Sequence, residues 1–172
     1  CPPILGIAPL APIVPSMLRD MHRQWRSYSG FSFTFKPFMD VGLLDHLDDE
    51  TVKKGMLAID PLSFQDQLKD VAKFAIMGSG DEFMQMDWTS IWSDELDLLG
   101  SFGEQHLSIA PNAEHTLLTN IYAVLSNVIT FSRSLATGQT AAERPSFTHF
   151  RDNTTGEIGI KIADGFKPEK VL

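Results

Sequence analysis

Two side chains near the middle of the chain could carry out proton-transfer chemistry together. Asp81 follows the apolar segment 73–77 by way of a Gly-Ser-Gly turn, and His115 lies in the loop after the apolar segment 105–109. A carboxylate that binds one nitrogen of an imidazole fixes its tautomer, so that the other nitrogen can take the proton of a serine. An acid and a histidine in this order, each beyond an apolar segment, therefore predict the last two members of a Ser…Asp…His array.

The serine of such an array is the member that we do not find. A G-x-S-x-G turn from an apolar strand into a helix, which exposes the nucleophile, occurs nowhere in the 172 residues. Ser29 and Ser79 stand beside glycines, but neither follows an apolar strand into a helix. The local sequence also leaves open that His115 is an ordinary loop or capping histidine. We expect that this chain alone has no serine-hydrolase activity.

The acid and the histidine need a sheet that brings them to one rim. Segments 4–10, 73–77 and 105–109 are apolar without alternation, which indicates strands covered on both faces, as in a parallel sheet. Because parallel strands share their carboxyl ends, Asp81 and His115 are expected within hydrogen-bonding reach on one rim. The predicted fold class is α/β, as the carboxyl-terminal half of an α/β-hydrolase-like parallel sheet. Its edge, segment 4–10, is expected to pair with a missing amino-terminal half of the same fold.

Helical patterns connect the predicted strands. Apolar side chains recur at helical spacing in 17–30, 62–70, 83–99 and 116–136. Residues 17–60 form a long connection, which we interpret as a cap-like helical insertion because long structured connections are more often functional than not. This connection contains four closely spaced phenylalanines, Phe31, Phe33, Phe35 and Phe38. They predict a short strand that packs in the core or, alternatively, the lining of a pocket.

The composition changes near residue 140. We assign residues 1–139 to the hydrolase-like domain, and residues 140–172 to a linker and the beginning of a β-sandwich-like domain. The tail alternates like antiparallel strands, with SFTHF before a turn and IGIKIA after it. Asn153 in that turn begins an N-x-T sequon and would accept a glycan if the protein is secreted.

The bulk composition argues against several classes of function. A net charge of −8 and a pI near 5.0, with the acids scattered, disfavour nucleic acid and anionic membranes as partners. No apolar run approaches the roughly 20 residues of a membrane span. The single cysteine, Cys1, permits no internal disulfide, and the other histidines lack metal-ligand spacing. Because Gly-rich phosphate loops are also missing, we expect neither a metal nor another cofactor.

Several motifs resemble those of one known family. They are GIAPLAPIV, AIDPLSFQDQL leading to KFAIMGSGDEF, HLSIAPNAEHTL, RPSFTHF and KPEKVL. Through these motifs, which are spread over nearly the whole chain, the sequence resembles the PhoPQ-activated pathogenicity-related proteins. This family includes the autocrine proliferation repressor proteins of amoebae. The resemblance implies a secreted or extracytoplasmic α/β-hydrolase-like protein with Asp81 and His115 as acid and histidine, and with the serine ahead of segment 4–10. Glu114 replaces the small residue often found before the histidine; a bulky acid there would raise the histidine's pKa or crowd the oxyanion side.

The sequence leaves three hypotheses about function open. In the first, the chain is part of a serine hydrolase that cleaves an ester, amide or peptide bond through an acyl-enzyme. In the second, a secreted signalling protein of the proliferation-repressor type uses the same scaffold to bind a protein partner or receptor without catalysis. Fold does not decide between these two, because such scaffolds host both. In the third, the chain is an independent αβ domain unrelated to hydrolases.

Overall fold

The computed structural model describes residues 3–12, 16–88, 103–145 and 147–166. The chain divides into two compact units, Cys1–Ser132 and Arg133–Leu172. Helices and sheets both occur in the described residues, so the fold is mixed α/β. The domain division at residue 140 stays a prediction.

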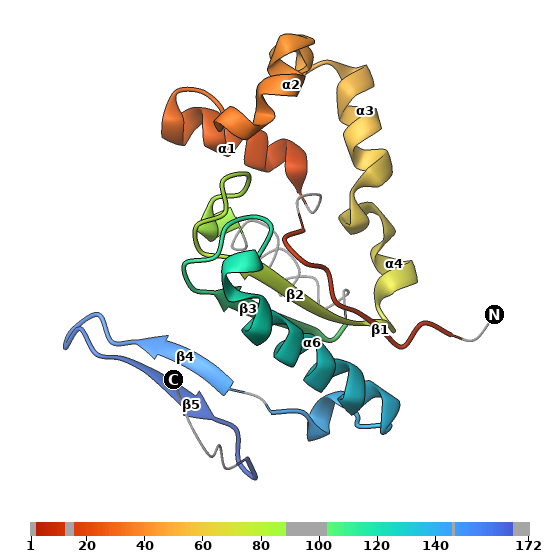
Figure 1. Ribbon diagram of the computed structural model, residues 1–172, viewed down its shortest axis with the longest axis vertical. Coiled ribbons are helices and arrows are strands. Elements are labelled where there is room, and N and C mark those ends of the chain that lie inside the picture. Colours follow the sequence, from red (N-terminus) through yellow and green to blue (C-terminus); the bar gives the residue numbers. More distant parts are fainter. Residues whose placement is uncertain (1–2, 13–15, 89–102, 146, 167–172) are drawn as a thin grey trace. The chain divides into compact units, whose positions relative to one another are not determined.

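Within the described residues, a three-stranded parallel sheet lies at the centre of the first unit (Figure 1). Its strands, in order across the sheet, are β1 (Gly6–Ile7), β2 (Ala72–Gly78) and β3 (Gln105–Ala110). β2 and β3 pair along six consecutive positions, beginning with Lys73 opposite Gln105. The predicted strands 73–77 and 105–109 are therefore confirmed as parallel neighbours.

The first strand is shorter than the apolar segment 4–10 predicts. Regular pairing covers only the two residues of β1, because Pro9 has no N–H to donate to a ladder. The chain nevertheless stays beside β2. The N–H of Ile76 donates to the carbonyl of Pro9 at 3.0 Å, and the N–H of Ala11 donates to the carbonyl of Ile76 at 2.7 Å. β1 is one of the two edge strands of the described sheet, and β3 is the other.

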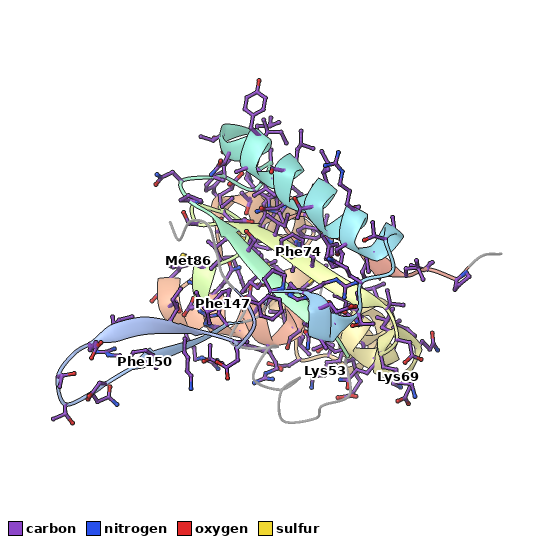
Figure 2. All side chains as sticks on the ribbon, turned by 90° about the horizontal axis from the view of Figure 1, so that it is seen from below. Lys53, Lys69, Phe74, Met86, Phe147 and Phe150 are labelled. Atoms are coloured by element: carbon purple, nitrogen blue, oxygen red, sulfur yellow. The ribbon has the colours of Figure 1, made fainter. Side chains whose placement is uncertain are left out.

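Successive side chains of β2 enter two different layers. Phe74 and Ile76 belong to the layer shared with helix α6 (Ile121–Ala136), and Figure 2 labels Phe74 there. Ala75 and Met77 point to the opposite face and pack against the long connection between β1 and β2. Because strand side chains alternate, one strand thus joins both layers of the core. This places the connection over one face of the sheet and α6 over the other (Figure 1).

The long connection consists of short helical pieces. Its α-helices are α1 (Met17–Tyr28), α2 (Lys36–Asp40), α3 (Glu50–Ile59) and α4 (Gln65–Leu68), and its 3-10 turns are η1 (Phe33–Phe35), η2 (Leu43–His46) and η3 (Pro61–Phe64). The predicted helix 17–30 is confirmed except for its end, because Ser29 turns into the left-handed region at φ 54°. Segment 62–70 forms a 3-10 turn and one α-helical turn instead of a single regular helix.

The phenylalanine-rich segment is not a strand, so that prediction is wrong. Phe33–Phe35 form the turn η1, whose beginning is capped by Ser32: its side chain accepts a hydrogen bond from the N–H of Thr34. Only Phe35 is fully buried within this turn, whereas Phe33 remains 77% exposed. A single aromatic side chain from the turn therefore enters the core beside Met77 and Met84.

Helix α6 begins later than segment 116–136 predicts. Leu117 adopts a left-handed φ of 60°, and the 3-10 turn η5 (Leu118–Asn120) precedes the helix. The predicted helix 83–99 falls mainly outside the described residues, and its described beginning contains the 3-10 turn η4 (Met86–Trp88). Among the described residues, no helix is both long and apolar enough to cross a membrane.

The second unit contains the predicted antiparallel hairpin. Its strands are β4 (Phe147–Arg151) and β5 (Ile158–Ile162), paired with Phe147 opposite Ile162. Figure 2 labels Phe147 and Phe150 on β4. The turn η6 (Ala141–Glu143) precedes the hairpin, and Thr140 with Glu143 forms a capping box at its start. Because an isolated pair of strands is only marginally stable, the hairpin alone does not establish a β-sandwich-like domain.

Candidate functional site

The structure brings the acid and the histidine into direct contact. Oδ2 of Asp81 lies 2.9 Å from Nδ1 of His115, at the carboxyl ends of the neighbouring strands β2 and β3. The Asp81 side chain is fully buried, whereas that of His115 is 25% exposed. The hydrogen bond therefore has the geometry that the sequence predicts, and the catalytic role of the two residues stays a prediction.

The carboxylate of Asp81 is held in one orientation by the backbone that follows it. Its Oδ1 accepts hydrogen bonds from the N–H groups of Phe83 at 2.8 Å and Met84 at 3.0 Å. With this oxygen engaged, Oδ2 is the one directed at His115. Aspartate suits such a turn because its short carboxylate readily binds the N–H two residues along the chain.

The loops after β2 and β3 are joined backbone to backbone. The N–H of Ser79 donates to the carbonyl of Ala110 at 3.0 Å, and the N–H of Gly80 donates to the carbonyl of Ala113 at 2.9 Å. A Cβ at Gly78 would lie only 2.3 Å from the carbonyl oxygen of Ala113. The glycine therefore permits the close approach that carries His115 to Asp81.

Two residues that sequence analysis missed hold the histidine from a second side. The N–H of His115 donates to Oε2 of Glu82 at 3.0 Å. The ring of Phe83 packs on the imidazole with centroids 4.4 Å apart and planes tilted by 44°. Their position directly after Asp81 was the only available sequence signal, because neither residue type marks a catalytic site.

Glu114, the residue before the histidine, binds the turn that follows His115. Its carboxylate accepts hydrogen bonds from the side chains of Thr116 and Thr119 and from the N–H of Leu118. Hydrogen bonds from Thr116 and then Thr119 lower the pKa of Glu114 to about 2. The carboxylate therefore caps the turn at 116–119, and an effect of this acid on His115 stays a prediction.

Three other histidines of the described residues each have a ring nitrogen close to one carboxylate. These pairs are His22 with Asp48 at 3.4 Å, His46 with Asp49 at 2.9 Å, and His106 with Glu104 at 2.6 Å. In the part of the chain that the structure describes, no three His, Cys, Asp or Glu residues come together as a metal site would require. The Asp81–His115 pair differs from these three in that its carboxylate side chain is fully buried.

Asn153 lies in the exposed turn between β4 and β5. The carboxylate of Asp152 accepts hydrogen bonds from the N–H groups of Thr154 at 2.7 Å and Thr155 at 3.2 Å, which fixes the turn. The amide of Asn153 is therefore accessible, as a glycan acceptor must be.

The sequence of the chain matches the family model "PhoPQ-activated pathogenicity-related protein" over residues 2–172. The chain belongs to this family. It is also 29% identical over 168 residues to "Autocrine proliferation repressor protein A" of Dictyostelium discoideum, covering 95% of this chain and 33% of the relative. The chain thus spans about a third of the length of this curated relative. No solved structure matches it.

Proposed function

We propose that this family member supplies the acid and the histidine of a serine-hydrolase-type active site on an α/β-hydrolase-like scaffold. The observation that carries the proposal is the 2.9 Å contact between Asp81 and His115. The pair lies where two adjacent parallel strands end, with a fully buried carboxylate and a partly exposed imidazole. The edge of a parallel sheet at the carboxyl ends of its strands is where α/β folds place their active sites.

The geometry suits His115 to act as a general base. In the proposed site, Asp81 accepts a hydrogen bond from Nδ1–H, which leaves the lone pair of the imidazole on Nε2. Among the described residues, no hydrogen bond reaches Nε2. In the proposed reaction this nitrogen takes the proton of a serine from outside the 172 residues while the serine oxygen attacks a carbonyl carbon. The same proton then passes to the leaving group, and water releases the acyl group from the serine.

Labelling with a fluorophosphonate probe tests this function in the complete encoded protein. We expect one serine to be labelled, and we expect His115→Ala to lower the labelling rate by at least a hundredfold. The purified 172-residue chain is expected to show no ester turnover. Absence of any labelled serine in folded complete protein would contradict the proposal.

The name of the Dictyostelium relative favours a second candidate function, which is secreted signalling without catalysis. In that function the same scaffold binds a protein partner or receptor. A growth assay separates the two candidates: cells receive the complete wild-type protein or its His115→Ala variant. Equal repression of proliferation by both proteins supports non-catalytic signalling, whereas loss of repression in the variant supports a role for hydrolysis.

Secretion and glycosylation form part of both candidates. The exposed Asn153 sequon supports a glycan at that position. Expression in a eukaryotic secretory host is expected to give a protein in the medium whose mass falls on glycosidase treatment. The Asn153→Gln variant is expected to lack this mass difference, and a wild-type protein that stays inside the cell would contradict secretion.

We also propose that the edge strand β1 pairs with a segment from outside the 172 residues. Four apolar side chains in or next to this edge are exposed, namely Ile4, Leu5, Ile7 and Leu10. An edge with unpaired backbone groups readily accepts another strand. Hydrogen exchange is expected to be fast at β1 in the 172-residue chain and slow in the complete protein. Slow exchange there in a monodisperse sample of the short chain would contradict this pairing.

A further inference from the structure

Side chains from the long connection hold the backbone immediately after the proposed catalytic acid. Nε2 of Gln24, on α1, donates to the carbonyl of Phe83 at 2.7 Å. Oγ1 of Thr34, in η1, donates to the carbonyl of Glu82 at 3.2 Å, and the hydroxyl of Ser32 donates to the same carbonyl. Two consecutive carbonyls are thus bound by side chains of one connection that lie 48 to 59 positions earlier in the sequence.

The surroundings of Gln24 permit one orientation of its side-chain amide. It is fully buried, and its Nε2 also donates to Oδ2 of the fully buried Asp20 at 2.9 Å. Its Oε1 accepts the N–H of Ser32 at 3.4 Å. Both ends of the amide are therefore engaged, and turning the amide over would bring its oxygen against a carboxylate and a carbonyl.

The two residues whose carbonyls are held also touch the histidine, beside Asp81. The carboxylate of Glu82 accepts the N–H of His115, and the ring of Phe83 packs on the imidazole. Phe83 packs in addition against Phe35 of the connection, edge to face, with centroids 5.5 Å apart. A continuous set of contacts therefore runs from α1 and η1 through this turn to His115.

We propose that Gln24 is a positioning residue for the Asp81–His115 pair and acts on it through Phe83. The proposal rests on the proposed hydrolase function for its effect on rate, but its effect on geometry can be measured without catalysis. Loss of the Nε2 donor would leave the partly buried Phe83 carbonyl and the buried Asp20 carboxylate without that partner. The turn that carries Asp81 would then shift, and misplacement by roughly 1 Å costs about a hundredfold in rate.

The test uses Gln24→Met, which preserves the side-chain length but removes the donor, in the complete protein with ¹⁵N-labelled histidine. The ¹⁵N shifts of His115, assigned with a His115→Gln variant, report which ring nitrogen carries the proton. We expect the Nδ1–H form to predominate in the wild type and to lose that predominance in Gln24→Met. We further expect kcat to fall about tenfold to a hundredfold, with KM within about twofold. The matched control is Gln67→Met at an exposed position of α4. It is expected to change neither the His115 tautomer nor kcat.

The outcomes separate the positioning role from the proposed function. A changed His115 tautomer in Gln24→Met without hydrolysis by the wild type supports positioning and contradicts the hydrolase. Hydrolysis by the wild type, with tautomer and kcat unchanged in a folded Gln24→Met, overturns positioning alone. If circular dichroism shows that this variant does not fold, Gln24→Asn is tested in its place, because the shorter side chain keeps the amide but withdraws its donor from the Phe83 carbonyl. An unchanged His115 tautomer in folded Gln24→Asn overturns the proposal.

Discussion

The rim that carries Asp81 and His115 and the hairpin of the second unit are stabilised in different ways. At the rim, several backbone groups are bound by side chains that lie 33 to 59 positions away in the sequence. In the hairpin, regular main-chain pairing joins β4 to β5, and the turn is closed by hydrogen bonds from residues within five positions. A side-chain change at the rim therefore alters the geometry of the site, whereas the hairpin depends mostly on its backbone.

The largest expected effect comes from the acid itself. Asp81→Asn preserves an oxygen that can accept the N–H groups of Phe83 and Met84, so the turn should persist. The variant loses the charge that favours Nδ1–H on His115, and by analogy with other triads the rate should fall about ten-thousandfold. The measurement is the fluorophosphonate labelling rate of the complete protein. The control is Asp66→Asn, at an exposed position of α4. A labelling rate that falls less than tenfold in Asp81→Asn would contradict a triad role.

A methyl group at Gly78 should have the next largest effect. Its Cβ would meet the backbone of the loop before His115 at 2.3 Å, and backbone cannot give way as a flexible side chain can. We expect Gly78→Ala to lower the free energy of unfolding by about 2–3 kcal/mol and to separate His115 from Asp81. Denaturant unfolding measures the free energy, and the ¹⁵N shifts of His115 report whether its hydrogen bond with Asp81 persists.

Gly55 supplies the matched control for that experiment. It lies within α3, and a Cβ there would meet nothing within 4 Å. Gly55→Ala should raise the free energy of unfolding by about 0.5–1 kcal/mol, because alanine is the better helix former. Equal stability of the two variants would show that the loop does not approach Gly78 as closely as the structure has it.

Asp20 gives a smaller effect that depends on pH. Burial, only partly offset by the Gln24 hydrogen bond and the charge of Arg23, raises the pKa of Asp20 above 3.8 in the folded state. Its favourable contribution to folding is therefore present below pH 3.8 and is lost as the pH rises through the higher folded pKa. The free energy of unfolding of Asp20→Asn should therefore increase relative to that of the wild type as the pH rises through the folded pKa of Asp20. Urea unfolding of both proteins at several pH values checks the trend, and a difference that stays constant with pH would contradict it.

The sequence predicts the parts of the site that depend on local apolar patterns. Segments 73–77 and 105–109 are strands because their apolar runs match buried parallel strands, and parallel pairing then brings Asp81 and His115 to one rim. Gln24 was not predictable in this way. Its function depends on a distant carbonyl, and every residue has a carbonyl, so the sequence holds no mark of the partner.

Errors in the predicted elements have similar causes. The helix 116–136 begins late because Leu117 adopts a left-handed backbone conformation, which a leucine does not signal. The phenylalanines at 31–38 alternate like a strand, yet the hydroxyl of Ser32 caps a 3-10 turn there. In both places, the backbone conformation at one or two residues overrides a pattern of side chains that is correct on average.

The smallest effect is expected in the hairpin, and it completes the comparison with the rim. Ile158 of β5 is 77% exposed, and threonine preserves its branched shape and β propensity. We expect Ile158→Thr to change the free energy of unfolding by less than about 0.5 kcal/mol and to leave the His115 shifts unchanged. If the complete protein instead loses more than about 1 kcal/mol while the 172-residue chain does not, further residues of the complete protein cover this face. The hairpin would then depend on distant side chains as much as the rim does.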